Sequence, residues 1–211
     1  MATAKVQNIH YWRPTIGQLR GMSRCLTDSN EIFSYLPKIS RIKRGKGEIT
    51  MPEEFKARLD YTKFGHEPLR SMYAIERYLH ESGINKRLLH MMKLRASQIN
   101  GCAYCIDMHW KDARAAGETE QRLYGLDAWR ESPYYTEKER AALEWTEALT
   151  LISETHAPDD VYERVRAQYS EKELVDLTLI VGMINMWNRI AIPFRAVPGL
   201  YQSKETAAAA G

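Results

Sequence analysis

Apolar residues recur every three or four positions through much of the chain from Glu67 onward, which is the spacing of amphipathic helices. The first such stretch ends before Gly83, a typical residue just after a helix. A second helix is expected over about Lys86–Ile99. A third is expected over Cys102–Ala116, followed by Gly117. The pattern therefore predicts three consecutive helices in this part of the chain.

Two later helices are indicated by capping boxes, in which a hydroxyl side chain and a glutamate three residues later bind each other's backbone N–H groups. Thr136 with Glu139 forms one such pair, and Ser170 with Glu173 forms the other. Between them, a shorter helix is expected over residues 158–169. No stretch alternates strictly between apolar and polar residues over more than a few positions. We therefore expect an all-α fold.

The most apolar stretch runs from Leu174 to Ile192. It contains residues that are costly in the hydrocarbon of a membrane, namely Asp176, Asn185, Asn188 and Arg189. It therefore predicts a buried helix and no membrane span. Gly182 within it costs about 1 kcal/mol relative to alanine, which favours close approach of another helix over contact with a ligand. Trp145 and Trp187 lie on apolar faces, so core or subunit contacts are expected for both rather than a substrate role.

Residues 1–56 show the least regular pattern. They contain a stretch of helical spacing, Ser29–Leu36, and a basic run, Lys38–Lys46. The run is interpreted either as a contact for an acidic partner or, more simply, as a solvated connector. Cys25 also lies here, and a lone cysteine is expected to pack as a small apolar residue rather than to act as a nucleophile.

Composition places the chain among ordinary globular proteins, with 44% hydrophobic and 27% charged residues in a length of 211. One domain with a substantial core accounts for this length. The net charge of +3 is small and no aromatic ladder separates the basic residues, so no nucleic-acid partner is expected. Three cysteines cannot form a disulfide framework, and the start, MATAKVQNIHYW, lacks the apolar core of a secretory signal. We therefore expect a cytoplasmic protein.

The segment QINGCAYCIDMHW carries the candidate chemistry, because two thiols and an imidazole lie within eight residues. If Gly101 ends one helix and the next begins near Cys102, the spacings of three and four place Cys102, Cys105 and His109 on one face. The N-terminus of a helix carries unpaired N–H groups and partial positive charge, which stabilise a thiolate. The segment therefore indicates a redox site or a metal site.

The redox interpretation is preferred among three. One thiolate attacks the substrate, the other cysteine resolves the product as a disulfide, and His109 accepts or holds the thiol proton. The spacing favours Cys105 as the thiol next to His109, with Cys102 as its partner. A zinc site would need a further ligand from a lone residue such as His90 or Asp107, because no second CxxC and no HxxxH occurs. A pair of inert buried thiols is the third interpretation.

His90 is a candidate for a proton relay, since it lies twelve residues before Cys102 in the preceding helix. If the two helices pack as a hairpin, His90 faces His109 directly or through a water. The alternative is a partly exposed surface histidine. The remaining histidines have no partner that the sequence identifies, and they are His10, His66, His80 and His156.

These residues resemble a known family. The segment KLRASQINGCAYCIDMHWKDARAAGETEQRL is similar to the signature of the carboxymuconolactone decarboxylase-like superfamily, in its alkylhydroperoxidase AhpD-type branch. The later segments ERAALEWTEALTLI, ELVDLTLIVGMINMWNRIAI and FRAVPGLY are similar to the C-terminal half of that family. The resemblance divides the chain into an N-terminal extension of unknown role (1–57), an AhpD-like domain (58–201) and a flexible C-terminal tail (202–211).

The resemblance implies an all-helical domain, assembled as a homotrimer or homohexamer, with peroxidase or disulfide-reductase activity and no metal, haem or other cofactor. It implies that Cys105 is deprotonated through His109 and reacts with a hydroperoxide, and that Cys102 then forms the disulfide. An external dithiol reductant protein would restore the thiols.

One position departs from the family pattern. The relay of the family has a glutamate twelve residues before the first cysteine, and this chain has His90 there. A carboxylate would raise the pKa of His109 and strengthen it as a base, whereas a neutral imidazole does not, so a weaker relay or one shifted to higher pH is expected. Two alternatives stay open: a lyase like other members of the superfamily, with His109 and His90 as acid and base, and a zinc-binding or interaction module.

Overall fold

The computed structural model describes residues 55–203, all within one of the two units into which the contacts of the chain divide it, Pro37–Gly211. The helix expected at 29–36, the basic run at 38–46 and Cys25 lie outside the described residues, as does most of the expected C-terminal tail. Residues 55–203 contain helices and no strand, so the all-α prediction is confirmed for them. The helices are α3 (Tyr61–Phe64), α4 (His66–Glu81), α5 (Lys86–Asn100), α6 (Ala103–Ala115), α7 (Glu120–Tyr124), the 3₁₀ helix η4 (Leu126–Ala128), α8 (Glu137–Thr150), α9 (Ile152–Thr155), α10 (Asp159–Arg166) and α11 (Glu171–Phe194).

Local sequence signals place the ends of the main helices. Helix α4 ends shortly before Gly83, and α5 ends directly before Gly101, both of which adopt positive φ angles. Helix α6 begins directly after Cys102, which is its N-cap residue in an extended conformation. Both expected capping boxes are present, at the starts of α8 and α11. The predictions for these helices are therefore confirmed.

Four short elements were not predicted, namely α3, α7, η4 and α9. Each spans five residues or fewer, which is too short to show a periodic apolar pattern. A local signal exists for α7, since the Thr119 side chain accepts a hydrogen bond from the backbone N–H of Arg122 at its start.

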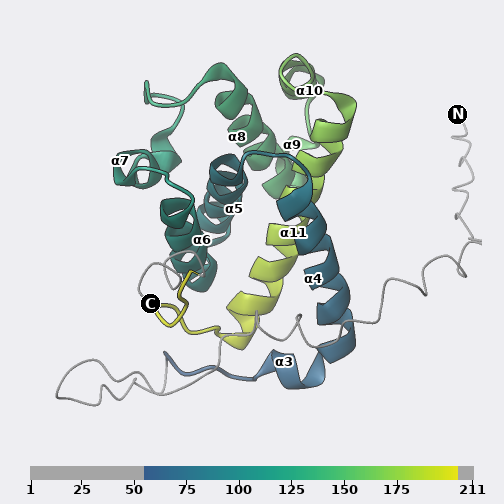
Figure 1. Cartoon of the computed structure of the whole chain (residues 1–211). Coiled ribbons are helices and arrows are strands. Elements are labelled where there is room, and N and C mark those ends of the chain that lie inside the picture. The colour runs from purple at the N-terminus through teal and green to yellow at the C-terminus, as the bar shows by residue number, and fades with distance from the viewer. Residues whose placement is uncertain (1–54, 204–211) are drawn as a thin grey trace, which may run out of the picture. The chain divides into compact units, whose positions relative to one another are not determined.

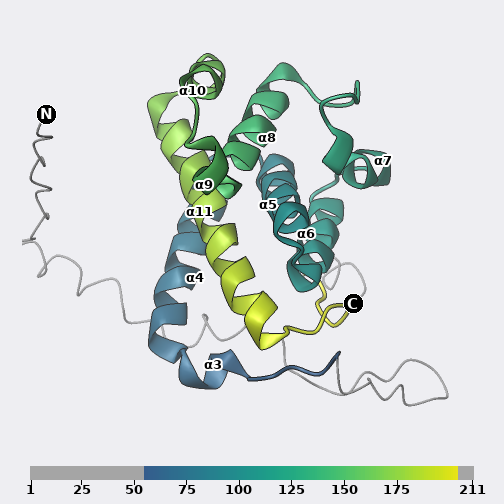
Figure 2. The same ribbon diagram turned by 180° about the vertical axis from the view of Figure 1, so that it is seen from behind.

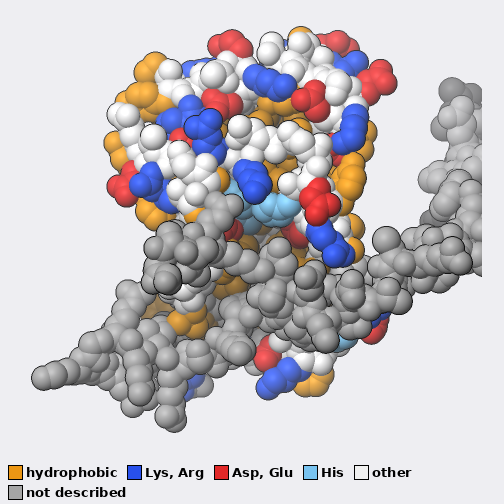
Figure 3. Space-filling view, viewed as in Figure 1, with side chains coloured by type: hydrophobic (Ala, Val, Ile, Leu, Met, Phe, Trp, Pro, Cys, Tyr) orange, Lys and Arg blue, Asp and Glu red, His pale blue; other side chains and the backbone are white. Residues whose placement is uncertain are grey.

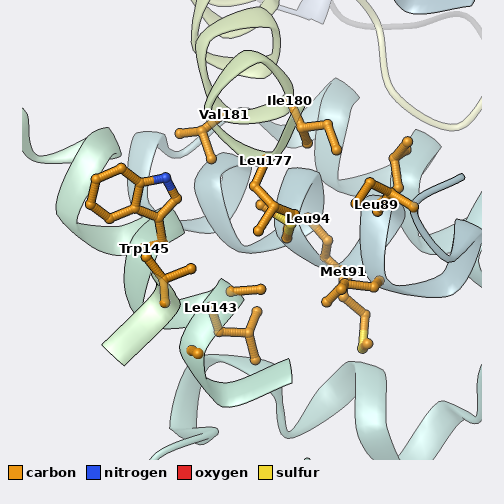
Figure 4. Close-up of a cluster of buried hydrophobic side chains, with 14 of the residues drawn as sticks. Leu89, Met91, Leu94, Leu143, Trp145, Leu177, Ile180 and Val181 are labelled. Atoms are coloured by element: carbon orange, nitrogen blue, oxygen red, sulfur yellow. The ribbon is translucent and has the colours of Figure 1, made fainter. Parts of the chain in front are cut away.

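Helix α11 is central to the fold. In Figures 1 and 2 it lies between α4 on one side and α5 and α8 on the other, and it contacts all three as well as α6. Figure 4 shows side chains of α5, α8 and α11 meeting between these helices: Leu89, Met91, Leu94, Leu143, Trp145, Leu177, Ile180 and Val181. Burial of apolar surface, at about 25 cal/mol per Å², stabilises this arrangement. It fixes α5, the helix that leads into the thiol segment.

Helix α11 is also, within residues 55–203, the one helix long and apolar enough to cross a membrane by length and composition. Its packing against α4, α5 and α8 accounts for that composition, because Asp176 and Asn188 on it are buried inside the protein. Trp145 lies in the core, as expected. We expected another helix to approach Gly182 closely, and among the described helices this expectation is wrong. Gly182 is exposed, and a Cβ added there would meet nothing within 4 Å.

Candidate active site

Helices α5 and α6 pack against each other, and the turn between them carries the thiol pair. Gly101 adopts a left-handed φ of 69°, which favours glycine, and the backbone N–H of Cys102 donates to Ser97 O over 3.0 Å. Cys102 is the N-cap of α6, and Cys105 lies in its first turn. The two Sγ atoms lie 2.8 Å apart, and both thiols are free and only 1% exposed. The sequence prediction that these two thiols lie together is therefore met by the geometry.

The two thiols titrate as a pair. The pKa of Cys102 is lowered to about 7, chiefly because a hydrogen bond with Cys105 stabilises its thiolate against the opposing effect of burial. Backbone N–H groups of Tyr104 and Cys105 at the start of α6 add to this effect. The pKa of Cys105 is raised, because the same hydrogen bond and burial oppose a second negative charge. The pair therefore loses one proton near neutral pH and keeps the other.

Asn188 of α11 interacts with the thiol pair. Its amide lowers the pKa of both thiols. It is fully buried, its Nδ2 donates to Ser97 Oγ over 3.2 Å, and its Oδ1 accepts from Asn100 Nδ2 over 2.8 Å. The sequence showed only that an asparagine interrupts an apolar stretch, since its contacts lie about ninety residues away.

His90 of α5 and His109 of α6 lie side by side, with ring centroids 5.7 Å apart, as expected if the two helices pack together. Both are buried, at 6% and 5% exposure. This burial, and then the charge of Lys93, hold the pKa of each imidazole well below its usual value. Nδ1 of His90 and both ring nitrogens of His109 have no hydrogen-bond partner within residues 55–203. The two rings are therefore neutral at pH 7, and among the described residues at least one nitrogen of each ring has no hydrogen-bond partner.

Helix α4 brings further groups to the histidines, and the sequence had not indicated them. The ring centroid of His80 lies 5.6 Å from that of His90. Glu76 of α4 forms an ion pair with Lys93 of α5, which is 2% exposed. The Oε1 atom of Glu76 also accepts a hydrogen bond from Trp187 Nε1 over 2.9 Å. The signal for Lys93 was its place in the apolar run LLHMMKL, because a lysine is fully buried almost only when it is paired.

Apolar and aromatic side chains enclose the thiols. The two cysteines form a small buried cluster with Ala96, Ile184 and Ala191, against which Tyr104, Trp187 and Ala196 pack. The Tyr61 ring stacks on Phe194 at 5.9 Å, and burial raises the pKa of Tyr61 to about 12. Trp187 therefore makes the core contact that was expected, but it does so beside the thiols. A cluster of this kind keeps water away from the sulfur atoms.

Asp112 lies one helical turn beyond His109 and joins the two histidines. One potential ligand atom from each of His90, His109 and Asp112 lies within 4.8 Å of the other two. The Tyr201 hydroxyl donates to Asp112 Oδ1 over 2.7 Å. Asp107, the carboxylate considered from the sequence, instead forms an ion pair on its own helix and is not part of this group.

Comparison with known proteins assigns the chain to a family. A model of the carboxymuconolactone decarboxylase family matches residues 68–148. The uncharacterized protein YdfG of Bacillus subtilis is 49% identical over 135 residues, which are 64% of this chain and 92% of YdfG. The chain therefore belongs to the carboxymuconolactone decarboxylase family.

Solved structures indicate the branch. A protein of unknown function from Agrobacterium tumefaciens, proposed to be the antioxidant defence protein AhpD, is 49% identical with a TM-score of 0.66, over 68% of this chain and 99% of its own. An uncharacterized peroxidase-related protein from Silicibacter sp. TM1040 shares the fold, with 22% identity and a TM-score of 0.59 over 72% of this chain and 95% of its own. Within the family, the chain is of the AhpD type.

Proposed function

We propose that this chain is a thiol-dependent hydroperoxide reductase whose redox pair is Cys102 and Cys105. The observation that carries the proposal is the 2.8 Å contact of the two Sγ atoms at the N-terminus of α6, with a pKa of about 7 for Cys102. A thiolate is the form that attacks an oxidant, and a second thiol in contact with it is placed to resolve the product. The AhpD type of the chain supports the same chemistry.

The reaction balances with these two sulfur atoms alone. A thiolate attacks the terminal oxygen of the hydroperoxide, the O–O bond breaks, and a sulfenic acid forms while the alkoxide leaves and takes up a proton. The second sulfur, deprotonated in turn, attacks the sulfenic sulfur and expels hydroxide, which is protonated to water. Two thiols and one hydroperoxide thus give one disulfide, one alcohol and one water. An external dithiol protein restores the thiols by exchange and is itself oxidised.

We assign attack to Cys105 and resolution to Cys102, as the family resemblance implies. His109 lies one turn beyond Cys105, and its nitrogens lack a partner in the described part of the chain, so we assign it the role of accepting the proton of Cys105. At rest the lowered pKa of Cys102 and the raised pKa of Cys105 favour the thiolate on Cys102. The 2.8 Å contact of the two Sγ atoms lets the remaining proton pass from Cys105 to Cys102, which leaves the attacking thiolate on Cys105. His90 stands where the family relay has its glutamate, and we assign it the next step of proton transfer, from His109 toward His80.

Thiol titration tests the proposal. A Cys25→Ser chain removes the third cysteine from the count. One equivalent of an alkyl hydroperoxide should then remove both remaining thiols, as measured with a chromogenic disulfide reagent after quenching. The matched control, with Cys102→Ser and Cys105→Ser added, should consume no peroxide. If both thiols of the Cys25→Ser chain persist in excess peroxide, the proposal is wrong.

Single variants test the order of the two sulfurs. If Cys105 attacks, the Cys102→Ser chain forms a stable sulfenic acid that dimedone traps, and the Cys105→Ser chain forms none. The opposite result would assign attack to Cys102. His109→Gln should slow peroxide consumption by about 10²–10⁴-fold, the range for loss of a general base. The exposed His66 provides the control, since His66→Gln should leave the rate unchanged.

We also propose that the chain acts as a homotrimer or homohexamer in the cytoplasm, where thiols are kept reduced. Val175, Leu179 and Met186 are apolar and exposed along one side of α11, and Gly182 lies among them. A second copy packed on this side would bury these side chains, and the glycine would allow a close approach between helices.

A further inference from the structure

A second set of side chains next to the thiol pair has the chemistry of a metal site. His90 comes from α5, whereas His109 and Asp112 come from α6 at the i, i+3 spacing that places two side chains on one face of a helix. Their ligand atoms converge to within 4.8 Å of one another, and neither thiol belongs to the group. We propose that His90, His109 and Asp112 bind a divalent transition-metal ion of the zinc type. This site goes beyond the proposed peroxide chemistry, which uses no metal.

The geometry is close to that of a ligated ion. Zinc binds imidazole nitrogen and carboxylate oxygen at about 2.0–2.2 Å, so two ligand atoms on opposite sides of the ion lie about 4 Å apart, and somewhat closer in a tetrahedron. In this structure the three ligand atoms lie within 4.8 Å of one another. Rotation of the imidazole and carboxylate side chains would bring them to the shorter separation that a bound ion requires. Two histidines and one carboxylate also match the three protein ligands of an open catalytic zinc site.

The surroundings favour these three residues as ligands. Nδ1 of His90 and both nitrogens of His109 are buried without a hydrogen-bond partner among the described residues, and an unsatisfied buried polar atom is costly. Asp112 supplies the negative charge, and the hydroxyl of Tyr201 donates to its Oδ1, as residues around a metal site commonly do for its ligands. The charge of the nearby Lys93 is offset by its ion pair with Glu76.

Two residues at this group are not fully buried. Asp112 is half-buried, in contrast to the two buried histidines. The His80 ring, in contact with His90, is exposed. Figure 3 shows that histidine side chains (pale blue) are visible at the surface in this view.

Metal binding by the reduced full chain, without peroxide, tests the site. Zinc is titrated in competition with a chromophoric chelator, and cobalt is used as a spectroscopic probe. We expect one ion per chain, and visible d–d bands of bound cobalt without the near-ultraviolet charge transfer of a cobalt–thiolate bond. The chain with Cys102→Ser and Cys105→Ser should bind equally well.

Ligand variants locate the ion. Asp112→Asn and His90→Gln should each weaken zinc binding at least about tenfold, and Tyr201→Phe by about 10–100-fold, as for loss of a residue that orients a ligand. Asp160→Asn, which removes an exposed carboxylate on α10, should have no effect and controls for net charge. Far-ultraviolet circular dichroism checks that each variant is folded, and Asp112→Asn, at a half-buried position, decides the case if the His90 variant is not.

Three results would overturn the site: no stoichiometric binding by the unaltered chain, binding that Asp112→Asn and Tyr201→Phe leave unchanged, or binding that disappears in the double cysteine variant. The last would place the ion on the thiols. Because no peroxide is present, a failure here leaves the proposed reductase untouched. Equally, a chain that binds zinc but keeps both thiols in excess peroxide would refute the reductase and leave the metal site standing.

Discussion

The buried ion pair between Glu76 and Lys93 provides a direct test of how charge is held beside the active site. The lysine side chain is 2% exposed and the glutamate side chain 16%. In Glu76→Gln the amide keeps an oxygen that can accept the hydrogen bond from Trp187, but the negative charge is lost. The ammonium group of Lys93 then remains buried without its counter-charge.

The expected cost is large for a change of so few atoms. Removing one partner of a buried pair costs about 3–5 kcal/mol, because an uncompensated charge is left in a medium of low dielectric. The partial exposure of Glu76 points to the lower end, about 3 kcal/mol. With an m value of about 2 kcal/mol per M, the midpoint of urea unfolding should fall by about 1.5 M. Replacing both residues, in Glu76→Gln with Lys93→Met, should recover most of the loss.

Urea unfolding followed by tryptophan fluorescence measures these changes, with all chains reduced and at one concentration. Glu120→Gln is the matched control, because its partner Arg114 lies 3.9 Å away and the glutamate side chain is 66% exposed. That variant should cost less than about 1 kcal/mol. A cost for Glu76→Gln no larger than that of the control, or a double variant less stable than Glu76→Gln, would refute the reasoning.

Three further predictions follow from the structure. Cys105→Ala should move the pKa of Cys102 from about 7 up toward its ordinary value, because the hydrogen bond that lowers it most is lost. The alkylation rate of Cys102, which tracks its thiolate, should then fall off at higher pH than when Cys105 is present, and an unchanged pH profile would contradict this. Gly101→Ala should cost about 1–2 kcal/mol of unfolding free energy, since φ is 69°, and a neutral effect in urea unfolding would show that the turn relaxes. Leu179→Lys should dissociate the proposed oligomer in gel filtration. The control Glu163→Lys, at an exposed position on α10, should not.

Much of the fold follows from local signals in the sequence. The glycine at 101 and the capping boxes at 136 and 170 act within a few residues, so the helices they bound could be placed without knowledge of the tertiary structure. For His90 the sequence left two alternatives open, a position facing His109 and a surface position, and the structure shows the first. Local signals thus predict the bounds of α5 and α6 and the turn between them.

The rest of the site depends on how distant helices pack. Asn188 reaches Ser97, and Tyr201 reaches Asp112, across about ninety residues. His80 approaches His90 because α4 and α5 both pack against α11, and a periodic sequence pattern does not give the angle between helices. For the same reason, the sequence named Asp107 as a possible further ligand of a zinc site on the thiols, whereas the carboxylate that lies near the two histidines is Asp112.

His109 links the two proposals and sets them in competition. A buried nitrogen without a hydrogen bond costs about 1–3 kcal/mol of stability. Several such nitrogens among the described residues of one site therefore indicate a functional role for them. In the proposed reductase the proton of Cys105 would bind the lone pair of one His109 nitrogen, and in the proposed metal site a zinc ion would bind the same lone pair. One lone pair cannot hold both, so metal binding and proton acceptance oppose each other through a coupling free energy that is equal in both directions. Zinc on His109 would therefore hold the thiol pair in its reduced, slowly reacting form, while the thiols themselves stay free of metal.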